Sequence, residues 1–134
     1  MSKPTKRLPD WMCRLDAFVR SVWSTPFEWG QNDCCTVAAG VVQACTGVDA
    51  MADLRGSYEG ELGAMRLIKR LGGLDHALTT RLGPVVPLAT AQAGDIGLGD
   101  DGRLVFCGGG HWKGPGDFGL VTTNEPVKVW RCHE

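Results

Sequence analysis

Apolar side chains in the first two thirds of the chain recur at the three- and four-residue spacing of amphipathic helices. The first of these segments begins after Pro9–Asp10 and stops at residues 24–26, and the second and fourth are followed by the helix-ending glycines Gly47 and Gly83. The pattern predicts helices over residues 10–23, 34–46, 59–71 and 74–82.

Beyond Gly94 the pattern changes to short segments rich in Val and Leu and separated by Gly, Asp, Asn and Pro. Helices followed by strands predict an α+β domain, in which the N-terminal helices pack on a small antiparallel sheet formed by the C-terminal third. No linker or repeat divides the chain, so we expect a single domain over residues 1–134 with a flexible tail at 1–8. The predicted strands cover residues 95–98, 103–107, 118–122 and 127–132, with a hairpin turn at 99–102.

The composition narrows the range of functions. Hydrophobic residues make up 43% of the 134 residues and charged residues 22%, which is typical of a folded globular chain. A formal net charge of −1 gives no electrostatic footprint for nucleic acid. No segment approaches the ~20 apolar residues of a membrane span, and the polar first ten residues do not resemble a signal peptide. We therefore expect synthesis in a reducing cytoplasm and six free, buried thiols rather than three disulfides.

The segment PFEWGQNDCC at residues 26–35 carries the main candidate chemistry. Asn32 and Asp33 are both good N-cap residues, so Cys34 falls in the first turn of the second predicted helix. The partial positive charge of a helix N-terminus lowers the pKa of a nearby thiol and stabilises an oxyanion. Cys34 lies at the centre of the apolar face of this helix, and Cys35 points about 100° away. Cys34 is therefore either a nucleophile or one more small buried side chain.

The same residues resemble the nucleophile segment of NlpC-type cell-wall peptidases, which are papain-like cysteine enzymes. Trp29–Gly30 stands a few residues before Asp33–Cys34, at the mouth of an apolar helix. Residues 93–96 resemble the turn that enters the first core strand of that family, and residues 103–109 resemble its next strand, which begins with the catalytic His.

Most of residues 10–131 resemble small tail proteins of tailed bacteriophages that share this fold. In those proteins the Trp-Gly-x-x-Asp-Cys block precedes a segment like Met51–Gly56 and a Gly-Gly-Leu step like Gly72–Leu74. The resemblance implies a structural protein of the tail tip, made in the bacterial host cytoplasm and carried in the virion. Its expected partners are other tail-tip or hub proteins, with peptidoglycan as a further candidate.

At two positions that matter for catalysis, this sequence differs from the active peptidases that it resembles. Arg103 occupies the family's His position, and a guanidinium stays protonated and cannot act as a general base. Phe27 stands where active peptidases often have Tyr. A replacement base would have to be His111, His76 or His133, of which His111 is the strongest candidate and also fits an ordinary loop histidine.

The alternative function is an active peptidoglycan hydrolase in which Cys34 attacks a peptide carbonyl and water releases the thioester. A third possibility is a host amidase that acts on small peptides. Zinc ligation by Cys107, His111 and Cys132–His133 is disfavoured because no C-x-x-C pair is present, so neither a metal nor a cofactor is predicted. Among the tryptophans, Trp11 and Trp23 are predicted in the core, Trp130 inward, and Trp112 as an exposed contact.

Overall fold

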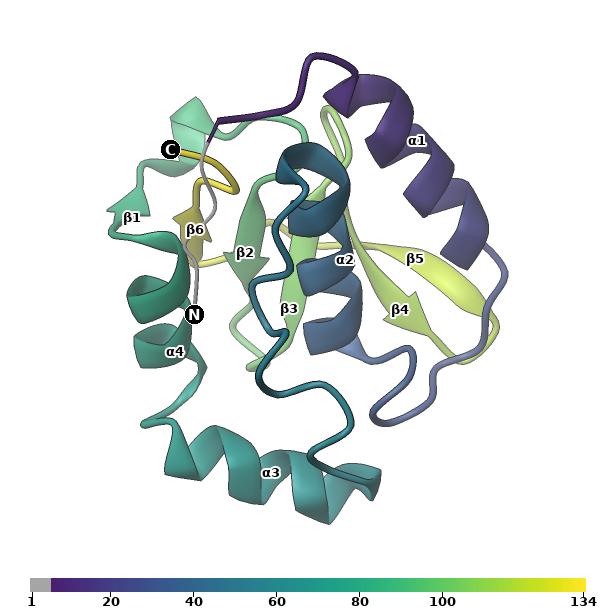
Figure 1. Ribbon diagram of the computed structural model, residues 1–134, viewed down its shortest axis with the longest axis vertical. Coiled ribbons are helices and arrows are strands. Elements are labelled where there is room, and N and C mark those ends of the chain that lie inside the picture. Colours follow the sequence, from purple (N-terminus) through teal and green to yellow (C-terminus); the bar gives the residue numbers. More distant parts are fainter. Residues whose placement is uncertain (1–5) are drawn as a thin grey trace.

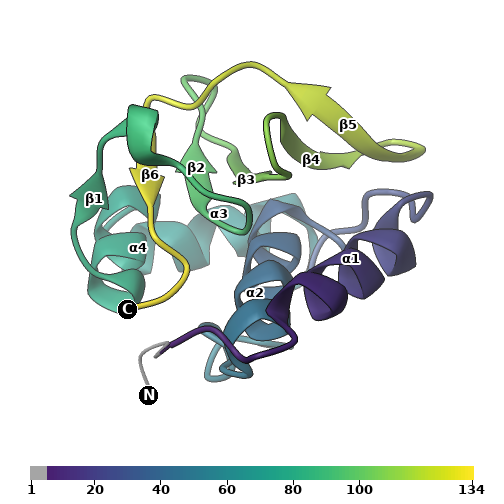
Figure 2. The same cartoon turned by 90° about the horizontal axis from the view of Figure 1, so that it is seen from above.

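The computed structural model describes residues 6–134, which fold into a layer of helices on one face of an antiparallel sheet of short strands (Figures 1 and 2). Residues 1–5 of the predicted tail lie outside the described residues. Leu8, at the end of that predicted tail, donates its N–H to the carbonyl of Cys45 at 2.8 Å. The helices within residues 6–134 are α1 (Trp11–Val22), α2 (Cys34–Thr46), α3 (Gly60–Arg70) and α4 (Leu74–Leu82), with a 3₁₀ turn at Leu88–Thr90.

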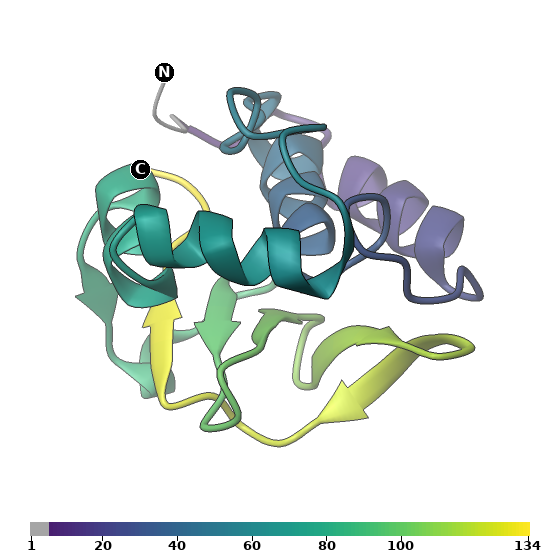
Figure 3. The same ribbon diagram turned by 90° about the horizontal axis from the view of Figure 1, so that it is seen from below.

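The helix prediction is confirmed for all four segments to within two residues at each end. Gly47 ends α2 in the left-handed conformation at φ 78°, which an L side chain rarely adopts. In Figure 3, α3 crosses in front of the start of α2, and α4 lies beside the far end of the sheet.

In the described part of the chain, six strands run in the order β1-β6-β2-β3-β4-β5, and all their pairings are antiparallel. Four of them match the predicted strands, and the turn at residues 99–102 is confirmed by the bond from the Gly99 N–H to the Arg103 carbonyl. The strands are β1 (Val85–Val86), β2 (Ile96–Leu98), β3 (Leu104–Cys107), β4 (Trp112–Gly116), β5 (Gly119–Thr123) and β6 (Lys128–Trp130).

The sequence prediction missed β1 and β4. β4 contains Gly114, Pro115 and Gly116, which are poor strand formers on their own. Pro115 lies opposite Leu120 of β5, whose N–H points away from β4 and donates to the carbonyl of Trp23. The two residues therefore form a non-hydrogen-bonded pair, and the lack of an N–H at Pro115 costs no hydrogen bond between β4 and β5.

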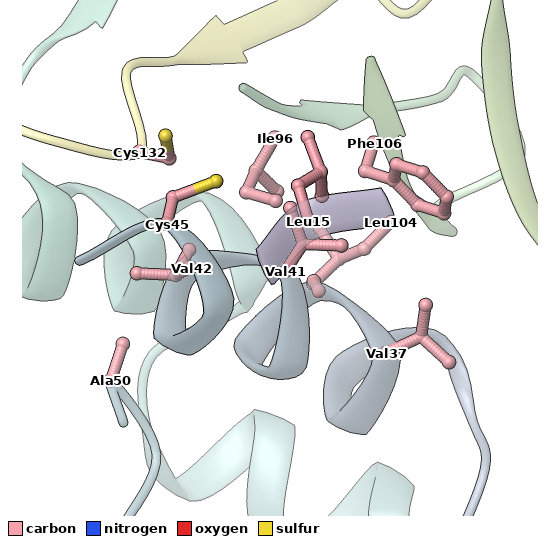
Figure 4. Packing of buried hydrophobic residues seen from close by; sticks show 11 residues of the cluster. Leu15, Val37, Val41, Val42, Cys45, Ala50, Ile96, Leu104, Phe106 and Cys132 are labelled. Atoms are coloured by element: carbon pink, nitrogen blue, oxygen red, sulfur yellow. The ribbon is translucent and has the colours of Figure 1, made fainter. Parts of the chain in front are cut away.

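The main core lies between α2 and the centre of the sheet (Figure 4). Val41, Val42 and Cys45 of α2 are almost fully buried against Ile96 of β2 and Phe106 of β3. Because residues of α2 and β3 pack against each other in this cluster, the start of α2 is held beside the start of β3.

Two tryptophan predictions are wrong. Trp112 is buried rather than exposed, because it lies in a second cluster with Val105 and Val129 and its ring fills the space beside Gly97. Trp23 is 55% exposed, because it caps the end of α1 beyond the helix face that contacts the core. Trp130 is fully buried, as predicted.

Candidate functional site

The start of α2 is fixed by a capping box. The Asp33 carboxylate accepts a hydrogen bond from the Thr36 N–H at 2.8 Å, and the Thr36 hydroxyl accepts one from the Asp33 N–H at 2.9 Å. The second Asp33 oxygen accepts the Gly30 N–H at 2.9 Å, which ties the preceding turn to the helix. The predicted N-cap role of Asp33 is confirmed.

Tyr58 also belongs to this site and was not predicted from the sequence. Its hydroxyl donates a short hydrogen bond to the same Asp33 oxygen that accepts the Gly30 N–H. Burial, followed by the bond to Asp33, raises the pKa of Tyr58, so the phenol stays neutral. Tyr58 lies 25 residues from Asp33 in a loop before α3, and no local pattern connects the two.

Cys34 is half-buried at this helix start, next to Cys35. A hydrogen bond from the Cys35 thiol lowers the pKa of Cys34, against an opposing effect of burial, and the Leu104 backbone and the Arg103 guanidinium lower it further. The pKa of Cys35 is raised because its thiol donates to Cys34 and is itself buried. Of the two neighbouring cysteines, the arrangement favours the thiolate at Cys34.

A groove runs past Cys34 on both sides. It consists of two adjoining hollows of about 350 and 320 Å³ that share Trp29, Cys34 and Arg103 as lining residues. Toward α3 the lining is mostly apolar and includes Tyr58, Met65 and Ile68, with Lys69 at the rim. Cys34 therefore lies where the two hollows meet.

The other half of the groove is lined by the sheet. Phe27 and Trp29 form its aromatic wall, with their ring centres 4.8 Å apart in an edge-to-face arrangement. Three carboxylates, Glu61, Asp101 and Asp117, line this half. The hollow toward α3 thus has Lys69 and the Asp33 carboxylate in its lining, the hollow along the sheet has three carboxylates, and Arg103 lines both.

The structure brings Arg103 to Cys34 but does not bring His111 there. Arg103 immediately precedes β3 and lines both hollows, in which no histidine is found among residues 6–134. His111 is exposed in the turn after the opposite end of β3, where its carbonyl accepts the Gly108 N–H at 2.7 Å. Because β3 is extended, its two ends are held apart, and the structure does not place His111 in the lining of the groove at Cys34.

The two other histidines also lie elsewhere. His76 is exposed on α4, and His133 is half-buried after β6 with its Nδ1 2.8 Å from the Glu134 carbonyl. The residues of β4 that extend past the paired part of β3 are Gly114, Pro115 and Gly116, which offer no titratable side chain to orient a base. Among residues 6–134, the site thus brings together the Cys34 thiol and the Arg103 guanidinium, with no histidine in the lining beside them.

All six cysteines are free thiols, but the prediction that they are buried holds only for Cys45, Cys107 and Cys132: Cys34 and Cys35 are half-buried and Cys13 is exposed. Cys107 lies in the Trp112 cluster and Cys132 in the main core, so the zinc ligands considered from the sequence are not brought together. Over residues 6–134, no three His, Cys, Asp or Glu side chains meet in a way that could hold a metal. In the same range, every helix is too short or too polar to cross a bilayer.

Comparison with known proteins gives one finding. A family model described as a domain of unknown function (DUF6950) matches residues 6–132, nearly the whole chain. No curated protein and no solved structure matches the chain significantly.

Proposed function

Since the chain belongs to the DUF6950 family, whose description gives no activity, we propose a function from the site itself: a papain-like domain of NlpC type that has lost hydrolysis and serves as a structural protein of a phage tail tip. The order of helices and strands and the placement of Cys34 at the start of α2 are compatible with that fold. The phage and tail-tip parts of the proposal come from the sequence resemblance.

One observation carries the loss of hydrolysis: the side chain that faces Cys34 from the start of β3 is Arg103. Cysteine hydrolysis of an amide needs a group that delivers a proton to the leaving amine. Arg103 supports the thiolate by its charge but keeps its protons near neutral pH. Acylation of Cys34 would therefore stall at the departure of the amine.

In this function the groove is a binding surface. Its aromatic wall, its carboxylates and the Arg103 guanidinium suit an extended polypeptide from a neighbouring tail protein, which would be held and not cut. The lowered pKa of Cys34 is then a remnant of the ancestral nucleophile.

The lowered pKa also supports the alternative, an active cysteine peptidase acting on peptidoglycan peptides. A thiolate in a groove open on both sides can attack a bound carbonyl and form a thioester. In that case a proton donor would come from the substrate or from water.

A hydrolysis assay on purified peptidoglycan distinguishes the structural function from the peptidase function. We expect the wild-type protein to clear the suspension no faster than Cys34→Ala, because the amine cannot leave. A phage that encodes Cys34→Ala is expected to assemble complete tails and to infect at the wild-type level. A loss of turbidity that depends on Cys34 would instead establish the peptidase.

A further inference from the structure

Cys45 and Cys132 form a second pair of thiols, outside the groove. Cys45 lies in the last turn of α2 and Cys132 follows β6, and both side chains are fully buried in the main core. Figure 4 shows the two sulfur atoms next to each other at one end of this core. Residues far apart in the sequence thus place two sulfurs side by side in the core.

Gly94 shows how closely the sulfurs converge. A Cβ atom at Gly94 would lie 2.9 Å from the Cys45 Sγ and 3.3 Å from the Cys132 Sγ, so both atoms occupy the space that this glycine leaves open. Each thiol acts on the other: interaction with the Cys132 thiol lowers the pKa of Cys45, against burial, and interaction with Cys45 raises the pKa of Cys132.

The backbones on both sides of the pair are anchored. The Cys45 carbonyl accepts the Leu8 N–H at 2.8 Å, and the Cys132 N–H donates to the buried Asp95 carboxylate at 3.2 Å. These bonds keep the two residues facing each other. A disulfide between them requires the two sulfurs to approach to about 2.05 Å.

We propose that Cys45 and Cys132 form an intramolecular disulfide when the folded protein meets a low-molecular-weight disulfide such as glutathione disulfide. The Cys45 thiolate attacks one sulfur of the oxidant, forming a mixed disulfide and releasing one glutathione thiolate. Cys132, after loss of its proton, attacks the Cys45 sulfur and releases the second glutathione thiolate. The protein loses two protons and two electrons, and glutathione disulfide is reduced to two glutathione molecules.

The other cysteines do not offer an equivalent pair. Cys13 is exposed on α1 and Cys107 lies in a different cluster. Cys34 and Cys35 are hydrogen-bonded neighbours, but their side chains leave α2 about 100° apart, so a bond between them would break the first helical turn. The bond from Cys45 to Cys132 instead closes a loop over most of the chain, which restricts the unfolded state strongly.

The test is oxidation of the full chain with glutathione disulfide, followed by alkylation of the remaining thiols, digestion and mass spectrometry without reductant. We expect a linked peptide pair that contains Cys45 and Cys132, and a Tm raised by roughly 5–15 °C that returns to its starting value with dithiothreitol. Cys45→Ala and Cys132→Ala should each lose the linked peptides and the Tm increase, whereas Cys34→Ala should keep both.

Access to the buried pair is tested in the same experiment with urea below the unfolding transition, where local opening is more frequent. If Cys45 and Cys132 remain reduced there while Cys13 is oxidised, the proposal is overturned. Linked peptides that join other cysteines, with this pair still free, would also overturn it. The peptide map of the wild-type protein decides the question even if an alanine variant does not fold, and its result does not depend on the function of Cys34.

Discussion

Asp33 is only 1% exposed, and its carboxylate accepts hydrogen bonds from three donors. The Thr36 N–H and the Gly30 N–H are local, whereas the Tyr58 hydroxyl comes from the loop before α3. A buried acidic group is stable only when such donors are present. Asp33 is therefore both the cap of α2 and the contact that ties the Tyr58 loop to the thiol site.

We predict that Tyr58→Phe lowers the free energy of unfolding by about 1–3 kcal/mol, because an Asp33 oxygen loses a donor in a buried setting. Urea denaturation of the two proteins measures the difference. In an Asp33→Asn background the same substitution should cost clearly less, since the charged acceptor is already gone. An equal cost in both backgrounds would mean that Tyr58 acts through packing alone.

The pH dependence of this contact has a definite sign. Because the pKa of Tyr58 is raised above its ordinary value of 10.0, the folded protein keeps the phenolic proton at a pH where the unfolded chain has lost it. The contribution of the Tyr58–Asp33 contact to the free energy of unfolding is fully present below pH 10 and decreases as the pH rises above 10. Since Tyr58 is the only tyrosine, tyrosinate absorbance should appear together with unfolding and not before it.

At the scale of elements, α1 and α2 cross at a glycine. The ring of Phe18 on α1 approaches Gly40 of α2 so closely that a Cβ atom there would lie 2.2 Å from the ring. This contact lets the two helices approach, and α2 is then held between α1 and β3 with its N-terminus at the groove.

We predict that Gly40→Ala lowers the free energy of unfolding by about 1–3 kcal/mol through overpacking against Phe18. The matched control is Gly63→Ala on α3, where the new Cβ would meet Tyr58 at 3.6 Å, an ordinary contact. That variant should gain about 0.5–1 kcal/mol from helix propensity. Thermal unfolding of both variants checks the pair, and a Gly40→Ala protein as stable as the wild type would contradict the helix crossing.

At the scale of the whole molecule, Asp95 ties the start of β2 to the end of the chain. Its side chain is fully buried and accepts the Gln92 N–H at 2.8 Å and the Cys132 N–H at 3.2 Å. The Arg131 Nε lies 3.3 Å from the same carboxylate. One residue thus connects the segment before β2 with the segment after β6.

We predict that Asp95→Ala lowers the free energy of unfolding by about 2–4 kcal/mol, because two backbone donors lose their acceptor and a half-buried guanidinium loses its ion-pair partner. Faster hydrogen exchange at Cys132 should accompany the loss. Asp100→Asn, at an exposed position in the β2–β3 turn, is expected to stay within about 0.5 kcal/mol of the wild type. Comparable losses in both variants would refute the anchoring role.

The sequence by itself determined the helices, the four strands with regular Val and Leu patterns, the cap at Asp33 and the position of Cys34. These features depend on side-chain periodicity and on hydrogen bonds between residues within a few positions of one another, so a short window of sequence is enough to predict them. The α+β class followed from the order of those elements.

Only the tertiary structure decided which groups meet. β4 forms despite its Gly and Pro residues because it pairs with β3 and β5, and Trp112 is buried because β4 forms. The bond from Tyr58 to Asp33, the distance of His111 from the groove and the convergence of Cys45 with Cys132 each depend on segments far apart in the chain. Such contacts are set by packing of the whole core, which no short window of sequence contains.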